Sequence, residues 1–206
     1  MEEPRSIIAV IISAALSAIP AVGGPLQTFF DYADEQQRYR VQSTAREICD
    51  LVGEEVLLGR VQENAELETL LTQALDAASR TGWEAKRKLL AKAVAHAFLN
   101  DEAVDPGVLI VSALKVLEPV HARALVRLAH ASDLSRQSGD NERKTAVEQA
   151  SFAEPTPVLA ALIQTGVALP ATLLGGGVKI WDVSDFGRQL LQDLRAVAVS
   201  DDSAWS

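Results

Sequence analysis

Apolar residues recur at helical spacing along most of this 206-residue chain. The spacing is clearest at residues 64–80 and 83–99, where apolar side chains return every three or four positions. They are Leu67, Leu70, Leu71, Ala74, Leu75 and Ala78 in the first stretch, and Leu89, Leu90, Ala93, Val94, Ala97 and Phe98 in the second. Each stripe predicts an amphipathic helix with one buried face.

Capping residues predict where two of the helices begin and end. A helix that starts near Pro25 is expected to end at Gly53, because glycine accepts the left-handed conformation that follows a helix. Thr81 and Glu84 have the spacing of a capping box, which predicts the start of the helix at residues 83–99.

Prolines mark the start of two further helices. Asp105 and Pro106 suit the N-cap and first position of a helix that ends near residue 117. Residues 108–117 carry a single charge, Lys115, so we expect them to be central to the core. Pro119 starts a sixth predicted helix.

The chain changes character after this sixth helix. Residues 132–153 are polar and Ser-rich, and their first part has no apolar periodicity. This composition predicts a mobile loop, within which residues 141–149 can form a short helix.

The C-terminal residues 156–197 predict a helix, a β-hairpin and a closing helix. Two short apolar segments, residues 171–174 and 178–183, flank the glycine triplet at residues 175–177, which indicates a hairpin. Ser184 suits the N-cap of the closing helix.

A charge-free stretch, residues 6–30, precedes the helical part. We consider three interpretations: a helix buried in the core or in an oligomer contact, a membrane-inserting segment, and a cleaved signal peptide. Its apolar core of residues 7–19 is short for a membrane span, and the acidic start of the chain is atypical of a signal peptide. The candidate membrane or oligomer contacts are Ile7, Ile8, Ile11, Ile12 and Leu16.

Two segments resemble parts of a winged-helix domain. The segment WDVSDFGRQLLQDL resembles the junction between the wing and the final helix in regulators of the MarR and PadR type, and LEPVHARALVRLAHA resembles an opening helix of that domain. The resemblance covers residues 117–198 and implies a winged-helix fold there. More broadly, the layout is similar to small all-helical bacterial proteins of unknown function, some of them linked to phage-abortive systems.

The predicted fold class is mainly α, a helical bundle followed by a winged-helix-like unit with one short β-hairpin. We expect an apolar N-terminal helix and turn in residues 1–30 and a helical bundle in residues 31–117. The winged-helix-like module would occupy residues 118–199, followed by a disordered tail, residues 200–206.

The charge distribution argues against nucleic-acid binding. The net charge is −9, and the first 112 residues hold 10 Lys and Arg against 17 Asp and Glu. A phosphate-binding surface needs clustered positive charge. The helix expected to read DNA, residues 157–166, offers only Gln164 and Thr165, so nucleic acid is not the expected partner.

Local cations and aromatics still provide candidate contacts. Those for a partner protein or a nucleic acid are Arg143, Lys144, Lys179 and Trp181. A second cluster, Lys86, Arg87, Lys88 and Lys92, is expected to form a solvated helix face, with an acidic partner or lipid headgroups as alternatives.

The sequence has no motif or residue spacing typical of a catalytic or metal-binding site. The single cysteine, Cys49, excludes an internal disulfide and suits the cytoplasm, and we interpret it as a small core residue. The histidines lack metal-ligand spacing, and the glycine triplet lacks the following Lys-Ser/Thr of a phosphate-binding loop. We therefore expect no enzyme, no cofactor and no metal site.

These observations favour a non-catalytic bacterial interaction or regulatory protein that acts through protein–protein contacts, with anti-phage defence as one setting. The expected partner is another protein or a second copy of the chain. One alternative is a membrane-acting effector that uses residues 6–30, which would make the cytoplasmic protein membrane-associated. Another is a DNA-binding transcriptional regulator.

Overall fold

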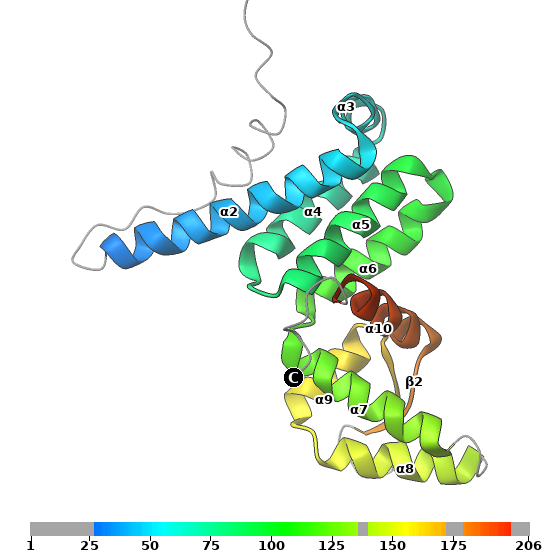
Figure 1. Cartoon of the computed structure of the whole chain (residues 1–206). Coiled ribbons are helices and arrows are strands. Elements are labelled where there is room, and N and C mark those ends of the chain that lie inside the picture. The colour runs from blue at the N-terminus through cyan, green and yellow to red at the C-terminus, as the bar shows by residue number, and fades with distance from the viewer. Residues whose placement is uncertain (1–26, 136–139, 172–178, 199–206) are drawn as a thin grey trace, which may run out of the picture. The chain divides into compact units, whose positions relative to one another are not determined.

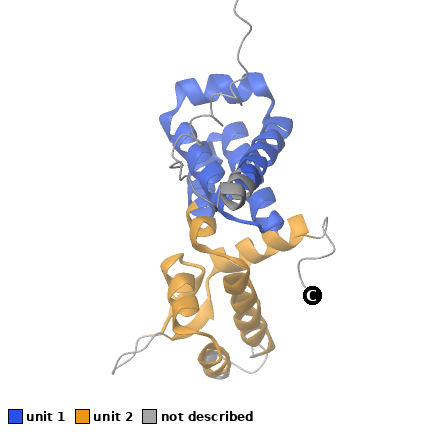
Figure 2. Cartoon of the chain, turned by 90° about the vertical axis from the view of Figure 1, so that its left-hand side faces the viewer, with its two compact units in different colours: residues 1–111 blue, residues 112–206 orange. Residues whose placement is uncertain are grey.

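The chain divides into two compact units, Met1–Val111 and Ser112–Ser206 (Figure 2). The computed structural model describes residues 27–135, 140–171 and 179–198, and it describes side chains there except at residues 27–34 and 135–144. The predicted N-terminal contacts Ile7, Ile8, Ile11, Ile12 and Leu16 lie outside the described residues, as do the glycine triplet and the predicted tail.

Unit 1 is built from helices that follow one another along the chain (Figure 1). They are α2 (Gln27–Val52), α3 (Glu54–Glu63), α4 (Ala65–Arg80), α5 (Glu84–Leu99), the 3-10 turn η1 (Asp101–Ala103) and α6 (Val104–Val116), which continues into unit 2. The long helix α2 packs across α4 and α5. The two predicted stripes are buried in this packing, with Leu67, Ala74 and Leu90 completely shielded from solvent.

The end of α2 is where the sequence predicts it. Gly53 has a φ of 87° and its amide donates to the Cys49 carbonyl at 2.8 Å, which closes the helix. A short helix, α3, begins immediately afterwards and was not predicted. It buries only Leu57, so it has no apolar stripe that periodicity could detect.

Two predicted helix starts are wrong in detail. Trp83, not Thr81, is the N-cap of α5, and the Thr81 hydroxyl instead accepts a hydrogen bond from the Trp83 amide at 3.2 Å. Helix α6 begins at Val104, because η1 leads directly into it, so Asp105 lies inside its first turn. On α6, Val111 and Leu114 are buried but Leu109 is 60% exposed, so the segment is only partly core.

Unit 2 contains more helix than the sequence predicts. Its elements are α7 (Pro119–Ser135), α8 (Asp140–Phe152), α9 (Thr156–Gln164), β1 (Ala168–Pro170), β2 (Ile180–Val183) and α10 (Asp185–Ala198). The predicted loop at residues 132–153 is wrong over most of its length, because α7 continues to Ser135 and α8 spans Asp140–Phe152, longer than the short helix expected within the loop. Helix α8 buries Val147 and Ser151 four positions apart, which is too little apolar surface for periodicity to detect.

The hairpin is present, but its first strand lies earlier than predicted. Strands β1 and β2 pair antiparallel, with Ala168 opposite Val183 and Pro170 opposite Ile180. Gly166, with a φ of 73°, ends α9 and lets β1 start at once. The mainly α fold with one short β-hairpin is thereby confirmed.

Candidate functional site

The hairpin joins α10 through a backbone contact that requires glycine. The Ser184 hydroxyl accepts a hydrogen bond from the Gly187 amide at 3.0 Å, as predicted for an N-cap, and donates to the Gly166 carbonyl at 2.6 Å. A Cβ on Gly187 would lie 2.1 Å from the Val167 carbonyl oxygen. The spacing of these residues therefore has a structural cause. Ser184 caps α10, Gly187 allows the close approach of the backbone, and Leu190 is buried in the core.

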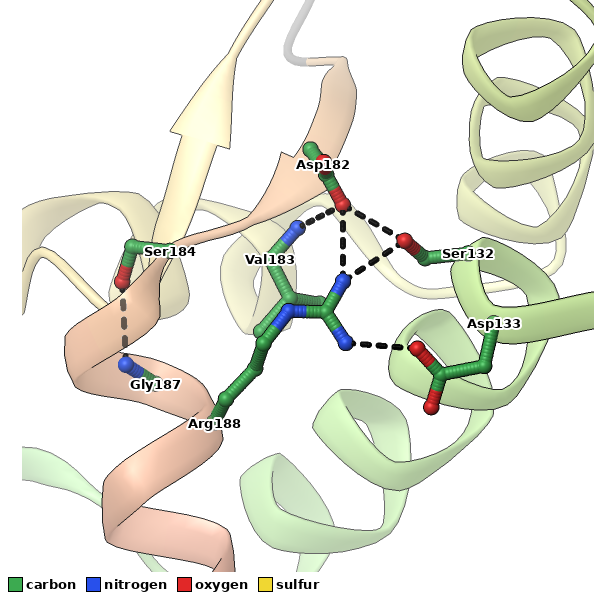
Figure 3. Close-up of polar contacts among 7 residues, drawn as sticks. All are labelled: Ser132, Asp133, Asp182, Val183, Ser184, Gly187 and Arg188. Atoms are coloured by element: carbon green, nitrogen blue, oxygen red, sulfur yellow. Dashed lines mark hydrogen bonds and ion pairs between the residues drawn. The ribbon is translucent and has the colours of Figure 1, made fainter. Parts of the chain in front are cut away.

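A buried polar network connects this junction to the end of α7 (Figure 3). Asp182 is its centre, because one carboxylate oxygen accepts from the Ser132 hydroxyl at 2.8 Å, the Val183 amide at 2.8 Å and Arg188 Nη2 at 3.2 Å. Arg188 also donates to the Ser132 hydroxyl oxygen at 2.6 Å and, through Nη1, to Asp133 at 2.8 Å. These contacts fix the guanidinium of Arg188, whose side chain is only 17% exposed.

A cleft of about 300 Å³ lies between α7 and α10 beside this network. One of its walls comes from α7 and the other from α10. The lining residues are Val126, Ala129, His130, Asp133, Arg188, Leu191, Gln192 and Arg195. On each helix these residues are spaced by three, four and seven positions. This spacing is visible in the sequence, but it does not show that the two helices form one cleft.

A groove of about 410 Å³ lies in unit 1 between α4 and α6. Its α4 side carries Glu66, Thr69 and Leu70, and its α6 side carries Asp105 and Val108. Helix α6 packs closely against both α5 and α4 at Gly107, where an added Cβ would lie 3.3 Å from the Ala97 Cβ and 3.4 Å from the Leu70 Cδ2. Val108 is 38% exposed and the adjacent Leu109 is 60% exposed.

Of the predicted partner contacts in unit 2, the structure describes the side chains of Lys179 and Trp181. Lys179 forms an ion pair with Glu148, and its ammonium lies 4.6 Å from the centroid of the Phe152 ring. Trp181 is half-buried at a register shift in the hairpin, where it is the extra residue on β2. Arg143 and Lys144 belong to α8, but their side chains lie outside the described set.

The basic cluster on α5 is not a simple solvated face, so that prediction is wrong. Lys86 is 1% exposed, and its position three and four residues before Leu89 and Leu90 places it on the buried stripe. Lys88 pairs with Glu84 at 3.1 Å. Burial raises the pKa of Glu47 on α2, and the positive charges of Lys88 and Lys92 oppose that increase. Part of the cluster therefore serves contacts within unit 1.

A two-point ion pair links α7 to the turn before α9. Arg127 donates to both carboxylate oxygens of Glu154, at 2.6 and 2.8 Å, and the Glu154 side chain is 4% exposed. These hydrogen bonds raise the pKa of Arg127 further above its ordinary value. Because the pair is bidentate, it fixes the orientation of both side chains.

The structure does not activate Cys49 as a nucleophile. Burial raises the pKa of its thiol, and the charges of Glu54 and Asp50 add to the increase, so the thiolate is disfavoured. Within the described ranges, no three His, Cys, Asp or Glu residues are grouped as metal ligands would be. In that same part of the chain, no helix has the length and hydropathy needed to cross a membrane.

Comparison with known proteins returns no relative: no family model, no curated protein and no solved structure matches the chain. Proposals about its function therefore depend on the groove, the helices that border it and the charges around them.

Proposed function

We propose that this chain is a non-catalytic interaction or regulatory protein that acts through protein–protein contacts. The observation that carries the proposal is the groove between α4 and α6, which is lined by the exposed Val108 and is followed on α6 by the exposed Leu109. Exposed apolar side chains beside a groove are typical of surfaces that bind another protein.

The charges around the groove favour a cationic partner segment. Glu66 and Asp105 line the groove, and the first 112 residues have an excess of acidic side chains. A second copy of this surface would bring like charges together. We therefore propose a partner helix with an apolar anchor for Val108 and Leu109 and with Lys or Arg beside it.

Three cations of unit 2 with described side chains support a protein partner over DNA. Arg127, Lys179 and Arg188 are engaged in ion pairs within the unit. Helix α9, in the position of a reading helix, has no Lys or Arg. A DNA-reading surface needs such groups directed at phosphates and base edges. We propose that unit 2 is a winged-helix-like scaffold, a proposal supported by the Ser184–Gly187 junction, and that it faces protein.

A photo-crosslinking amino acid tests the groove directly. Placed at Leu109 in the full chain and expressed in the native host, it should give one dominant crosslinked protein, with the attachment peptide rich in Lys or Arg. The matched control is the same amino acid at Thr72, which is exposed on α4 but does not line the groove.

The outcomes separate the competing functions. Equal crosslinking from positions 109 and 72, or none from 109, would overturn the proposal. Crosslinking of position 109 to a second copy would assign the groove to self-association. A mobility shift on duplex DNA at low salt would favour the DNA-binding alternative.

A further inference from the structure

Helix α3 is attached to unit 1 more weakly than the helices around it (Figure 1). Of its ten residues only Leu57 is buried, whereas α4 and α5 each bury a long apolar stripe. The burial of an apolar face supplies most of the free energy that holds a helix in a protein. The attachment of α3 therefore depends on a single apolar anchor, Leu57.

One ion pair fastens α3 to the turn η1. Arg60 Nη2 donates to Asp101 Oδ1, and the Arg60 and Asp101 side chains are 27% and 78% exposed, so water and salt screen the pair. Arg60 Nε is shielded from solvent and has no hydrogen-bond partner among the described residues. Because an unsatisfied buried donor disfavours this arrangement, the ion pair is a weak latch.

The helices on either side of α3 end in caps that do not need α3. The Gly53 amide donates to the Cys49 carbonyl at 2.8 Å, which closes α2. The Asn64 side chain accepts a hydrogen bond from the Glu66 amide at 2.9 Å, which caps α4. The segment between Gly53 and Asn64 can therefore lose its structure while α2 and α4 keep theirs.

Once detached, α3 is too short to remain a helix. Isolated helices of fewer than about 12 residues are marginal in water, and α3 has ten. Gly59, in its interior, lowers the helix propensity further, and a Cβ there would meet nothing within 4 Å. Detachment and unfolding of α3 are therefore one event.

We propose that α3 is a switch segment, which detaches and unfolds between Gly53 and Asn64 while α2, α4 and α5 stay folded. Leu57 is its anchor and the Arg60–Asp101 pair is its latch. Opening releases the apolar segment VLLGRV, residues 56–61, and frees the Asp101 carboxylate. An order–disorder transition of one segment is a common way for a protein to switch between two states.

The switch segment leads directly into the groove between α4 and α6. Ala65 and Glu66, which follow Asn64 in the chain, line that groove. Opening of α3 would thus present a second apolar segment beside the groove. The use of that segment by a partner rests on the proposed function, but the opening itself does not.

Hydrogen–deuterium exchange of the full chain at residue resolution tests the switch without any partner. We expect the amides of residues 58–63 to be at least about tenfold less protected than those of residues 70–78 in α4, because they exchange through local opening. Protection of the two sets to the same degree would overturn the proposal. The exchange experiment and the crosslink at Leu109 can fail independently.

Two matched variants test the latch. Asp101→Asn and Glu102→Gln each remove one exposed acidic group from η1, and of the two only Asp101 pairs with Arg60 in the structure. Asp101→Asn should speed the exchange of residues 58–63 about two- to fivefold, and Glu102→Gln should change it less than about twofold. An equal change in the two variants would overturn the role of the ion pair.

A third variant separates local opening from unfolding of the whole unit. Ala77→Gly weakens α4 and should speed the exchange of residues 70–78 about fivefold. Residues 58–63 should change less than about twofold, because α4 is folded both before and after α3 opens. If both sets of amides accelerated together, α3 would not be an independent switch segment.

Discussion

The two units treat buried polar groups in opposite ways. In unit 1 Thr44 is 1% exposed, and its hydroxyl has no hydrogen-bond partner among the described residues. In unit 2 Asp182 is similarly shielded, but its carboxylate accepts hydrogen bonds from Ser132, Val183 and Arg188. Unit 1 therefore tolerates an unsatisfied polar atom within an apolar helix packing, whereas unit 2 uses polar atoms to connect its elements.

The difference also concerns the kind of contact that joins distant parts of the chain. In unit 1 the helix α2 packs on α4 and α5, which come later in the chain, through apolar stripes. The network of unit 2 joins Ser132 to Asp182 and Asp133 to Arg188, fifty or more positions apart. The stability of unit 2 should therefore be sensitive to the loss of single hydrogen bonds or ion pairs. The stability of unit 1 should instead follow changes in the volume and polarity of its buried side chains. The following predictions test this comparison.

Gly187→Ala should have the largest effect. The added Cβ would meet the Val167 carbonyl oxygen at 2.1 Å, so the backbone of the junction must move. We expect a loss of at least about 3 kcal/mol in the free energy of unfolding, measured by urea denaturation. Among the described glycines only Gly53 and Gly166 have a positive φ, so the cost at Gly187 is steric.

Gly59→Ala is the matched control in unit 1. Gly59 lies inside α3 with nothing within 4 Å of its added Cβ. Alanine should stabilise that helix by about 0.5–1 kcal/mol. If the two substitutions gave similar results, the close approach at the junction would not be a determinant of unit 2.

Arg188→Met should have the next largest effect. It leaves the shielded Asp182 carboxylate without its cation while keeping the apolar stem of the side chain. We expect a loss of about 2 kcal/mol, less than for a fully buried pair because Asp182 keeps the Ser132 and Val183 donors. Arg123→Met, at an exposed position, should stay within about 0.5 kcal/mol of the wild type. A smaller loss for Arg188 than for Arg123 would contradict the role of the network.

Local sequence signals predicted the helices that have strong apolar stripes or clear caps. The buried faces of α4 and α5, the end of α2 at Gly53 and the cap at Ser184 all depend on neighbours within four residues. Helix α8 was expected only as a short helix within a loop, because the described part of the helix buries just Val147 and Ser151. Lys86 was assigned to a solvated helix face, because a lysine side chain is usually exposed even beside an apolar stripe.

The candidate sites were harder to predict for a different reason. The cleft forms only because α7 and α10 lie side by side. No local sequence pattern predicts that Arg188 pairs with Asp133. The spacing of His130 and Asp133, and of Arg188 and Arg195, is visible in the sequence, but it gains meaning only once the two faces are paired. Lys179 is the opposite case. The sequence makes it a candidate partner contact, but in the structure its ammonium pairs with Glu148 and lies over the Phe152 ring.

Thr44→Val should have the smallest effect of the series. It should increase stability, whereas Gly187→Ala and Arg188→Met decrease it. Valine keeps the shape of threonine and removes a buried hydroxyl that has no partner among the described residues. We expect a gain of about 1 kcal/mol in the free energy of unfolding, because an unsatisfied buried polar group costs about that much or more. Thr72→Val is the control: Thr72 is exposed and its hydroxyl already donates to the Glu68 carbonyl, so it should gain nothing. A loss of stability in Thr44→Val would show that the hydroxyl is satisfied in solution, and the contrast between the two units would then rest on the polar network of unit 2 alone.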